Sequence, residues 1–314
     1  MSGPSGLKRV GCYYVESIKK MPEGTSSSLI NLGDLSKPAD TLIKKVSKAV
    51  GGIFAPYQIK RVARAEAEAA LIKAQTEIHI TDLHRRAVHR FVEEEAKHQK
   101  NMEDITAKAL PQLNDKADPL KVEDDWIANF FDKCRIVSDD EMQGLWSRIL
   151  AGESNSPGTY SKRTVNFLSD LDKRDAEKFT HLCGFAWMIA GFRPLIYDVH
   201  HAIYNNQGID FYWLSHLESI GLIQFDNLGG FRLLQLPKRF SLLYYGKPVC
   251  LEMPKDSDNE MQIGTVMLTR IGQELAPISG SKPVDGFLEY VTEKWRGFKY
   301  LPGNKTEQAG PIKG

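Results

Sequence analysis

Apolar residues recur at helical spacing along most of this chain, and the longest such pattern lies in its amino-terminal third. The stretch from Gln58 to Leu110 contains neither glycine nor proline and consists mainly of good helix formers. It predicts a long charged helix over residues 58–110, with a narrow apolar stripe along one side. The stripe positions expected to mediate self-association are Val62, Ala69, Ile72, Ile80, Leu83 and Phe91.

A narrow apolar stripe on a long helix is best buried against a partner helix, as in a coiled coil. We therefore expect the chain to form a homo-oligomer through this helix. The alternative is a helix that folds back near Thr81 and Asp82 within one subunit, where the stripe is covered without a second chain.

A shorter amphipathic segment, residues 37–57, precedes the long helix, with lysines opposite its apolar face. A basic amphipathic helix can lie on an anionic membrane surface. The alternative is that its apolar face packs on the rest of the protein. For a membrane or a partner protein, the candidate contacts are Lys44, Lys45, Lys48, Ile53 and Phe54.

A helical core is expected over residues 120–190. Its second helix has Ser138 and Glu141 at the spacing of a capping box, and Gly152 is the expected stop. A further helix is expected from Asp172 to Met188. Short loops join these helices, which is typical of a compact bundle. The expected buried residues are Trp126, Ile127, Phe130, Phe131, Met142, Leu145, Trp146, Ile149 and Leu150.

The sequence pattern changes in residues 191–301, where helical and strand spacings of apolar residues both occur. Phe211–Ile220 reads as a helix, and Leu222–Phe225 and Phe231–Leu236 alternate like the two strands of a hairpin. A strand at Gly264–Leu268 then runs into a short helix. This order resembles a winged-helix module.

The predicted fold is therefore mainly α, with a long N-terminal helix or coiled coil, a helical core and a C-terminal winged-helix-like α+β module. A flexible arm over residues 1–36 and a disordered tail over residues 302–314 complete it, because both are rich in polar residues, glycine or proline.

Charge and motifs exclude several classes of protein. Lys plus Arg (41) nearly balances Asp plus Glu (40), so no bulk charge favours nucleic acid. The four cysteines are scattered singly, which favours reduced thiols over disulfides or zinc. Phosphate-binding glycine loops, metal-ligand spacing and nucleophile motifs are all missing from the sequence, so we predict no enzyme, metal or cofactor. We expect a cytoplasmic protein, with the inner membrane face as the alternative location.

Nucleic-acid binding is an alternative that depends on the winged-helix interpretation. A recognition helix normally presents Arg, Lys, Asn or Gln to the DNA. The segment Asp210–Ile220 has neither Lys nor Arg, and the nearest basic pair is Lys238 and Arg239. A module with an acidic helix is better suited to protein contacts.

Four segments carry a family resemblance: KRVARAEAEA, HQKNMEDI, the stretch DDWIANFFDKCRIVSDDEMQGLWSRILAGE, and LTRIGQEL. They are similar to an uncharacterised bacterial family, domain-of-unknown-function 2806, over most of residues 35–280. GGIFAP and LWSRILA are more distantly similar to the Abi-alpha proteins of abortive infection. Neither resemblance implies an activity or a catalytic residue. The second implies a biological context, a bacterial phage-response system.

The resulting hypothesis is a non-enzymatic interaction or assembly protein, a component of such a phage-response system. The alternatives are a DNA-binding winged-helix regulator and a peripheral membrane effector acting through residues 40–56.

Overall fold

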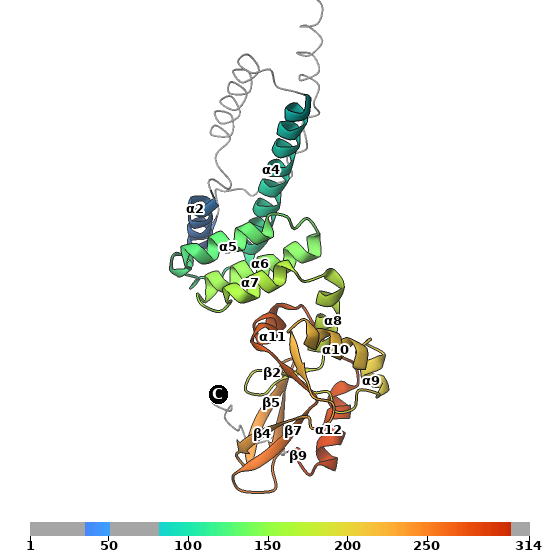
Figure 1. Cartoon of the computed structure of the whole chain (residues 1–314). Helices are drawn as coiled ribbons and strands as arrows, with labels where there is room; N and C mark the ends of the chain where they lie inside the picture. Colours follow the sequence, from blue (N-terminus) through green and yellow to red (C-terminus); the bar gives the residue numbers. More distant parts are fainter. Residues whose placement is uncertain (1–34, 51–81, 303–314) are drawn as a thin grey trace, which may run out of the picture. The chain divides into compact units, whose positions relative to one another are not determined.

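The computed structural model describes residues 35–50 and 82–302 (Figure 1). It is an α+β protein in which helices predominate. The described helices and strands all belong to one compact unit, Lys37–Gly314. The predicted flexible arm lies almost wholly outside the described residues, as do the predicted tail beyond residue 302 and the long-helix residues up to 81.

Helices build the first half of the described chain. The long helix is present as α4 from Asp82, and it ends at Pro111 in the 3-10 turn η2 (Leu110–Gln112). Its carboxyl-terminal half packs on α6, and α5 packs against α2 and α7. The helices here are α2 (Lys37–Val50), α4 (Asp82–Ala109), α5 (Asp124–Cys134), α6 (Asp140–Asn155) and α7 (Lys162–Ser169).

An aromatic cluster holds these helices together, as the periodicity predicts. The ring of Phe130 contacts Trp126, Phe131 and Trp146, with ring centroids 5.1–5.2 Å apart. All four side chains are buried, so their burial contributes strongly to the stability of this core. Met142 differs from the prediction, because it is only partly buried and lines a pocket.

The ends of α6 differ from the prediction. Its N-cap is Asp139 and not Ser138: the Asp139 carboxylate accepts the backbone N–H groups of Glu141 and Met142. Gly152 does not stop the helix, which continues to Asn155. The reason is that Gly152 makes room for a tyrosine ring, so the glycine serves packing and not termination.

The helix predicted to run to Met188 is shorter. It is α8 (Lys173–Cys183), and the chain then turns into β1 (Ala186–Met188). Phe185 and Trp187 are fully buried in an aromatic cluster with residues of the second half of the chain. The tertiary burial of these aromatic residues thus overrides the helical spacing that continues through them.

A five-stranded sheet, order β2-β1-β5-β6-β9, lies at the centre of the second half, and its neighbours are antiparallel. Trp187 of β1 stacks on Tyr244 of β5 and meets Trp295 of α12 edge-on. The remaining strands are β2 (Phe192–Pro194), β5 (Arg239–Tyr244), β6 (Lys247–Glu252) and β9 (Leu301–Pro302), and helix α12 spans Phe287–Gly297.

The hairpin predicted between residues 222–225 and 231–236 is wrong. Both segments are strands, β3 (Ile223–Phe225) and β4 (Phe231–Leu236), but they do not pair with each other. β3 pairs with β8 (Val266–Leu268), and β4 pairs with β7 (Asn259–Gly264). Asp226 accepts the backbone N–H groups of Leu228 and Gly229 in the turn between β3 and β4, and the two strands then pair with partners that lie further along the chain.

Two short helices of the second half lie where the sequence predicts helices. The helix predicted at Phe211–Ile220 is α10 (Phe211–Ser219), and Gly221 follows it with a positive φ. The predicted strand-to-helix passage is β8 followed by α11 (Arg270–Leu275) and the 3-10 turn η4 (Ala276–Ile278). A short helix, α9 (Ala202–Asn205), precedes α10.

Candidate functional site

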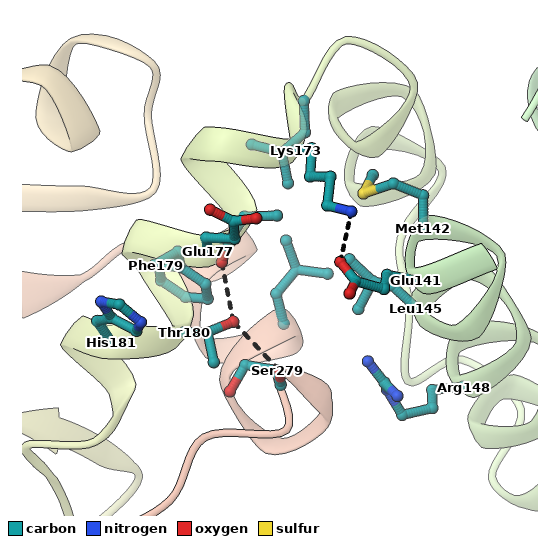
Figure 2. A pocket seen from close by; sticks show the side chains of 13 residues that line it. Glu141, Met142, Leu145, Arg148, Lys173, Glu177, Phe179, Thr180, His181 and Ser279 are labelled. Atoms are coloured by element: carbon teal, nitrogen blue, oxygen red, sulfur yellow. Dashed lines mark hydrogen bonds and ion pairs between the residues drawn. The ribbon is translucent and has the colours of Figure 1, made fainter. Parts of the chain in front are cut away.

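A pocket of about 270 Å³ lies where α6, α8 and the turn η4 meet (Figure 2). One wall comes from the amino-terminal turns of α6, the opposite wall from α8, and the floor from the end of α11 and the start of the loop after η4. The chain therefore builds this pocket from three segments that are distant in sequence.

The inside of the pocket is mainly apolar. Leu145, Leu171, Phe179 and Leu275 are buried side chains that form its wall, and the flexible thioether of Met142 adds to them. Such a lining offers an apolar body a favourable transfer from water, because it removes apolar surface from solvent.

An ion pair closes the upper rim. Lys173 Nζ lies 2.7 Å from a carboxylate oxygen of Glu141 and 3.4 Å from Asp139. The hydrogen bond to Glu141 is the main reason that the pKa of Lys173 is raised. The charge of Lys173 is thus already matched by α6, and the lysine holds the amino-terminal ends of α6 and α8 together.

Arg148 is the unusual group of the pocket. It projects from α6 beside the apolar wall (Figure 2) and is about half buried, and burial lowers the pKa of its guanidinium. Its Nε is buried, and in the described part of the chain no acceptor bonds to it. Nor do the described residues provide an ion pair for this arginine. An arginine that is partly desolvated without a carboxylate partner is uncommon, since desolvating a charge costs free energy.

The lower side of the pocket is polar but internally bonded. Thr180 Oγ1 lies 2.8 Å from the carbonyl oxygen of Ala176 and 3.2 Å from that of Ser279. His181 turns away, with Nδ1 3.0 Å from the Gln207 carbonyl oxygen. These groups orient the walls, and Arg148 is left as the polar group with unused donors.

A partly buried carboxylate, that of Glu274, connects α11 to α7 near the pocket. Glu274 Oε2 accepts the hydroxyl of Thr164 at 2.6 Å and the backbone N–H of Ser161 at 2.9 Å. Arg270 donates to Glu274 Oε1 at 3.0 Å. Because Ser161 is the N-cap of α7, this contact fixes a helix start of the first half to α11, the helix whose last residue lines the pocket.

Cys183 lines a neighbouring apolar pocket, and burial raises its pKa to about 12, which leaves it a poor nucleophile at neutral pH. Among the described residues, no three His, Cys, Asp or Glu side chains gather as metal ligands would. Within the same residues, none of the helices combines the length and apolar character needed to cross a membrane.

The predicted self-association stripe is described only in part. Leu83 and Phe91 lie on α4 and are 65% and 63% exposed. Val88 and Val92 on the same helix are also exposed, as is every other residue from 82 to 97. The stripe positions Val62, Ala69, Ile72 and Ile80 lie outside the described residues.

The lysines of α2 separate into different roles. Lys45 is partly buried, donates to the carbonyl oxygen of Leu120 at 3.0 Å and pairs with Asp124, whereas Lys44 pairs with Asp40 on the surface. Lys48 is exposed. Leu42 and Val46, on the apolar face of α2, are fully buried, so this part of the face packs on the protein, which was the alternative to membrane contact. Ile53 and Phe54 lie outside the described residues.

The candidate nucleic-acid contacts are neutralised by neighbours. Lys238 Nζ lies 2.7 Å from Asp256, and Arg239 lies 3.2 Å from Glu252. These pairs are exposed and therefore contribute little to stability. They leave less free positive charge for a phosphate backbone than the sequence suggests.

Nothing in the sequence singles out Arg148 as a candidate binding residue. It lies inside the apolar run LWSRILA at a position that helical spacing assigns to the edge of the buried face. No motif surrounds it, and its pocket partners come from α8 and α11. The only available signal was a single arginine flanked by Ile149 and Leu150, which is also the signature of an ordinary snorkelling side chain.

The model of one protein family, "Protein of unknown function (DUF2806)", matches residues 85–292. The chain belongs to this family. The match covers nearly all of α4, the helical core and every strand except β9, including every residue that lines the pocket. It supports the first of the two resemblances and leaves the similarity to Abi-alpha proteins untested. Searches of curated proteins and of solved structures returned no match.

Proposed function

We propose that this protein is a non-enzymatic assembly protein that self-associates through the exposed apolar side chains of α4. The observation that carries the proposal is the contrast along this helix. Its carboxyl-terminal half buries Ile105 and Ala109 against α6, while its amino-terminal half exposes an apolar set on the same subunit. The members of that set that share one face of the helix, Leu83 and Phe91, are here called the α4 stripe, and Val88 and Val92 are exposed further around the helix.

The physical reason is the cost of hydrating this surface. A large apolar side chain gains roughly 1.5–3 kcal/mol when it is fully buried. Helix pairing covers such side chains at the a and d spacing. Around the stripe α4 is densely charged, with pairs such as Arg90–Glu94 between adjacent turns. Charged flanks beside an apolar seam are typical of helices that select a partner helix.

Sedimentation velocity of the full chain at micromolar concentration tests the proposal. Wild type is expected to sediment as an oligomer, and Phe91→Glu is expected to shift it towards the monomer, because a carboxylate would be buried in the seam. Leu228→Glu is the matched control: Leu228 is 99% exposed in the turn between β3 and β4, outside the stripe. A monomeric wild type, or equal dissociation by both variants, contradicts the proposal.

A second candidate function is protein recognition by a winged-helix-like module. It is supported by the order α8, β2, α9, α10, β3 and β8, and by the parallel bridge between Ile196 and Gly264, which brings the chain after β2 beside the strand pair. The exposed start of α10 carries Phe211 and Tyr212 and no basic residue. We infer a protein partner in preference to DNA. Salt-sensitive retention of duplex DNA, lost in Lys238→Ala/Arg239→Ala, would reverse that preference.

The biological setting that we propose, a bacterial phage-response system, rests on the Abi-alpha resemblance alone. Deleting the gene from its host and measuring phage plaque formation tests it: equal plaquing with and without the gene removes this setting but leaves the assembly proposal standing.

A further inference from the structure

We propose that the pocket between α6, α8 and η4 binds a small amphipathic anion, one carboxylate or phosphate group on an apolar body, with Arg148 as the counter-ion. This inference is independent of self-association through α4.

The charges around the pocket favour a single negative group. Lys173 is engaged by Glu141 and Asp139 on the upper rim. Arg148 therefore remains as the cation without a carboxylate partner among the described residues. A guanidinium offers several N–H donors in a planar fork that fits carboxylate or phosphate oxygens. Half burial strengthens such a pair, because the surroundings screen it less than water does.

The opposing charge is placed where it interferes little. Glu177 projects from α8 on the far side of the pocket from Arg148 (Figure 2) and is exposed to solvent. Water screens a carboxylate in that position. The Glu177 carboxylate disfavours a second negative group beside α8. The geometry therefore favours a ligand with its anionic group at Arg148 and a neutral body facing α8.

The body of the ligand is expected to be apolar and compact. Leu145, Leu171, Phe179 and Leu275 supply a buried apolar wall. The volume of about 270 Å³ is below the range of roughly 300–1,000 Å³ of drug-sized sites. It exceeds the ~150 Å³ cavity that accepts a benzene ring. A molecule of one ring and a short acidic arm fits these limits, whereas a nucleotide does not.

Met142 provides a direct reporter, because its thioether lines the pocket. The full chain, labelled with ¹³C at the methionine methyl groups, is titrated with phenylacetate and with phenyl phosphate. The Met142 signal is assigned with Met142→Leu. We expect this signal to shift saturably, and the tighter of the two probes identifies the preferred anionic group.

Two further probes separate the contribution of the aromatic ring from that of the negative charge. Benzyl alcohol has the ring without the charge, and inorganic phosphate has the charge without the ring. Both are expected to bind at least tenfold more weakly than the better aromatic anion. Saturation by inorganic phosphate at the same concentration would overturn the amphipathic ligand class.

The variant Arg148→Met removes the charge and keeps a long side chain. It should weaken binding of the aromatic anion at least tenfold, whereas Arg163→Met, an exposed arginine on α7, should leave binding unchanged. Without ligand, Arg148→Met is expected to melt at or above the wild-type temperature, because no partner loses its counter-ion. If it does not fold, Arg148→Lys takes its place, with retained but weaker binding. No Met142 shift with either aromatic anion, or equal affinity in Arg148→Met, overturns the proposal.

Discussion

Gly152 lies so close to Tyr160 that a Cβ atom on the glycine would stand 2.6 Å from Cε2 of the tyrosine ring. The backbone of Tyr160 is held by two hydrogen bonds. Its backbone N–H donates to Glu153 at 2.8 Å, and its carbonyl oxygen accepts Trp126 Nε1 at 2.7 Å. The loop after α6 is thus fixed to the helix that it leaves, and the glycine inside α6 is explained by this contact.

Gly152→Ala should therefore lower stability, although alanine favours a helix by about 1 kcal/mol over glycine. The added Cβ overpacks a site whose neighbour is held on both sides, which costs about 1–3 kcal/mol. We expect the free energy of unfolding, measured in urea, to fall by up to about 2 kcal/mol.

Gly144→Ala in the same helix is the matched control for that change. Its Cβ would meet only Arg148 Nη1 at 3.9 Å, an ordinary contact. Helix propensity then dominates, and stability should rise by about 0.5–1 kcal/mol. A Gly152→Ala protein as stable as Gly144→Ala would show that the Tyr160 ring is free to move.

Glu274→Ala is expected to loosen the connection between α11 and α7. It removes the acceptor of Thr164 Oγ1 and of the Ser161 N–H, both partly buried donors, at a cost of about 2 kcal/mol. Urea unfolding gives the magnitude, and faster hydrogen exchange at Ser161 locates it. Arg270→Ala is the control, because the Arg270 side chain is 79% exposed and its pair contributes under about 1 kcal/mol. Equal losses in both variants would mean that Glu274 acts through Arg270 alone.

Asp139 should make the protein sensitive to acid. Its hydrogen bond from the Met142 N–H is the main reason that its pKa is lowered from 3.8. A lowered pKa in the folded state means that this stability is present above pH 3.8 and is lost as pH falls through the folded value.

The variant Asp139→Asn separates titration from capping, because asparagine still accepts the N–H groups but does not ionise. Its melting temperature should match wild type near neutral pH and fall less steeply below about pH 4. Asp139→Ala, which loses the cap, should melt lower at neutral pH as well. A parallel acid profile in wild type and Asp139→Asn would remove Asp139 as the titrating group.

Local patterns predicted much of the fold. The aromatic face around Phe130, α10 with Gly221 after it, and the strands β3 and β4 all follow from short-range spacing. The pairing of β3 did not, because its partner Val266–Leu268 lies beyond a turn that has the residues of a hairpin loop. The end of α8 was missed for a related reason, since the burial of Trp187 by Tyr244 and Trp295 is a long-range effect.

The candidate pocket could not be predicted from the sequence. Nothing in the sequence around Arg148 or Lys173 shows which of the two cations has an acidic partner. Only their surroundings distinguish them, because Lys173 meets Glu141 while the described residues leave Arg148 without an anion. The surface stripe of α4 was the opposite case: periodicity places Leu83 and Phe91 on one apolar face, and both side chains are exposed on α4.

The pairing of β3 with β8 has a consequence for synthesis of the protein. On the ribosome, β3 emerges some forty residues before the strand that completes it, so the nascent chain must hold Ile223 and Phe225 without their partners for several seconds. The residues that join α4 to α6 and α5 to α7 have all emerged before β3, so these helices can pack in that interval. The amino-terminal half thus provides a folded platform before the sheet closes.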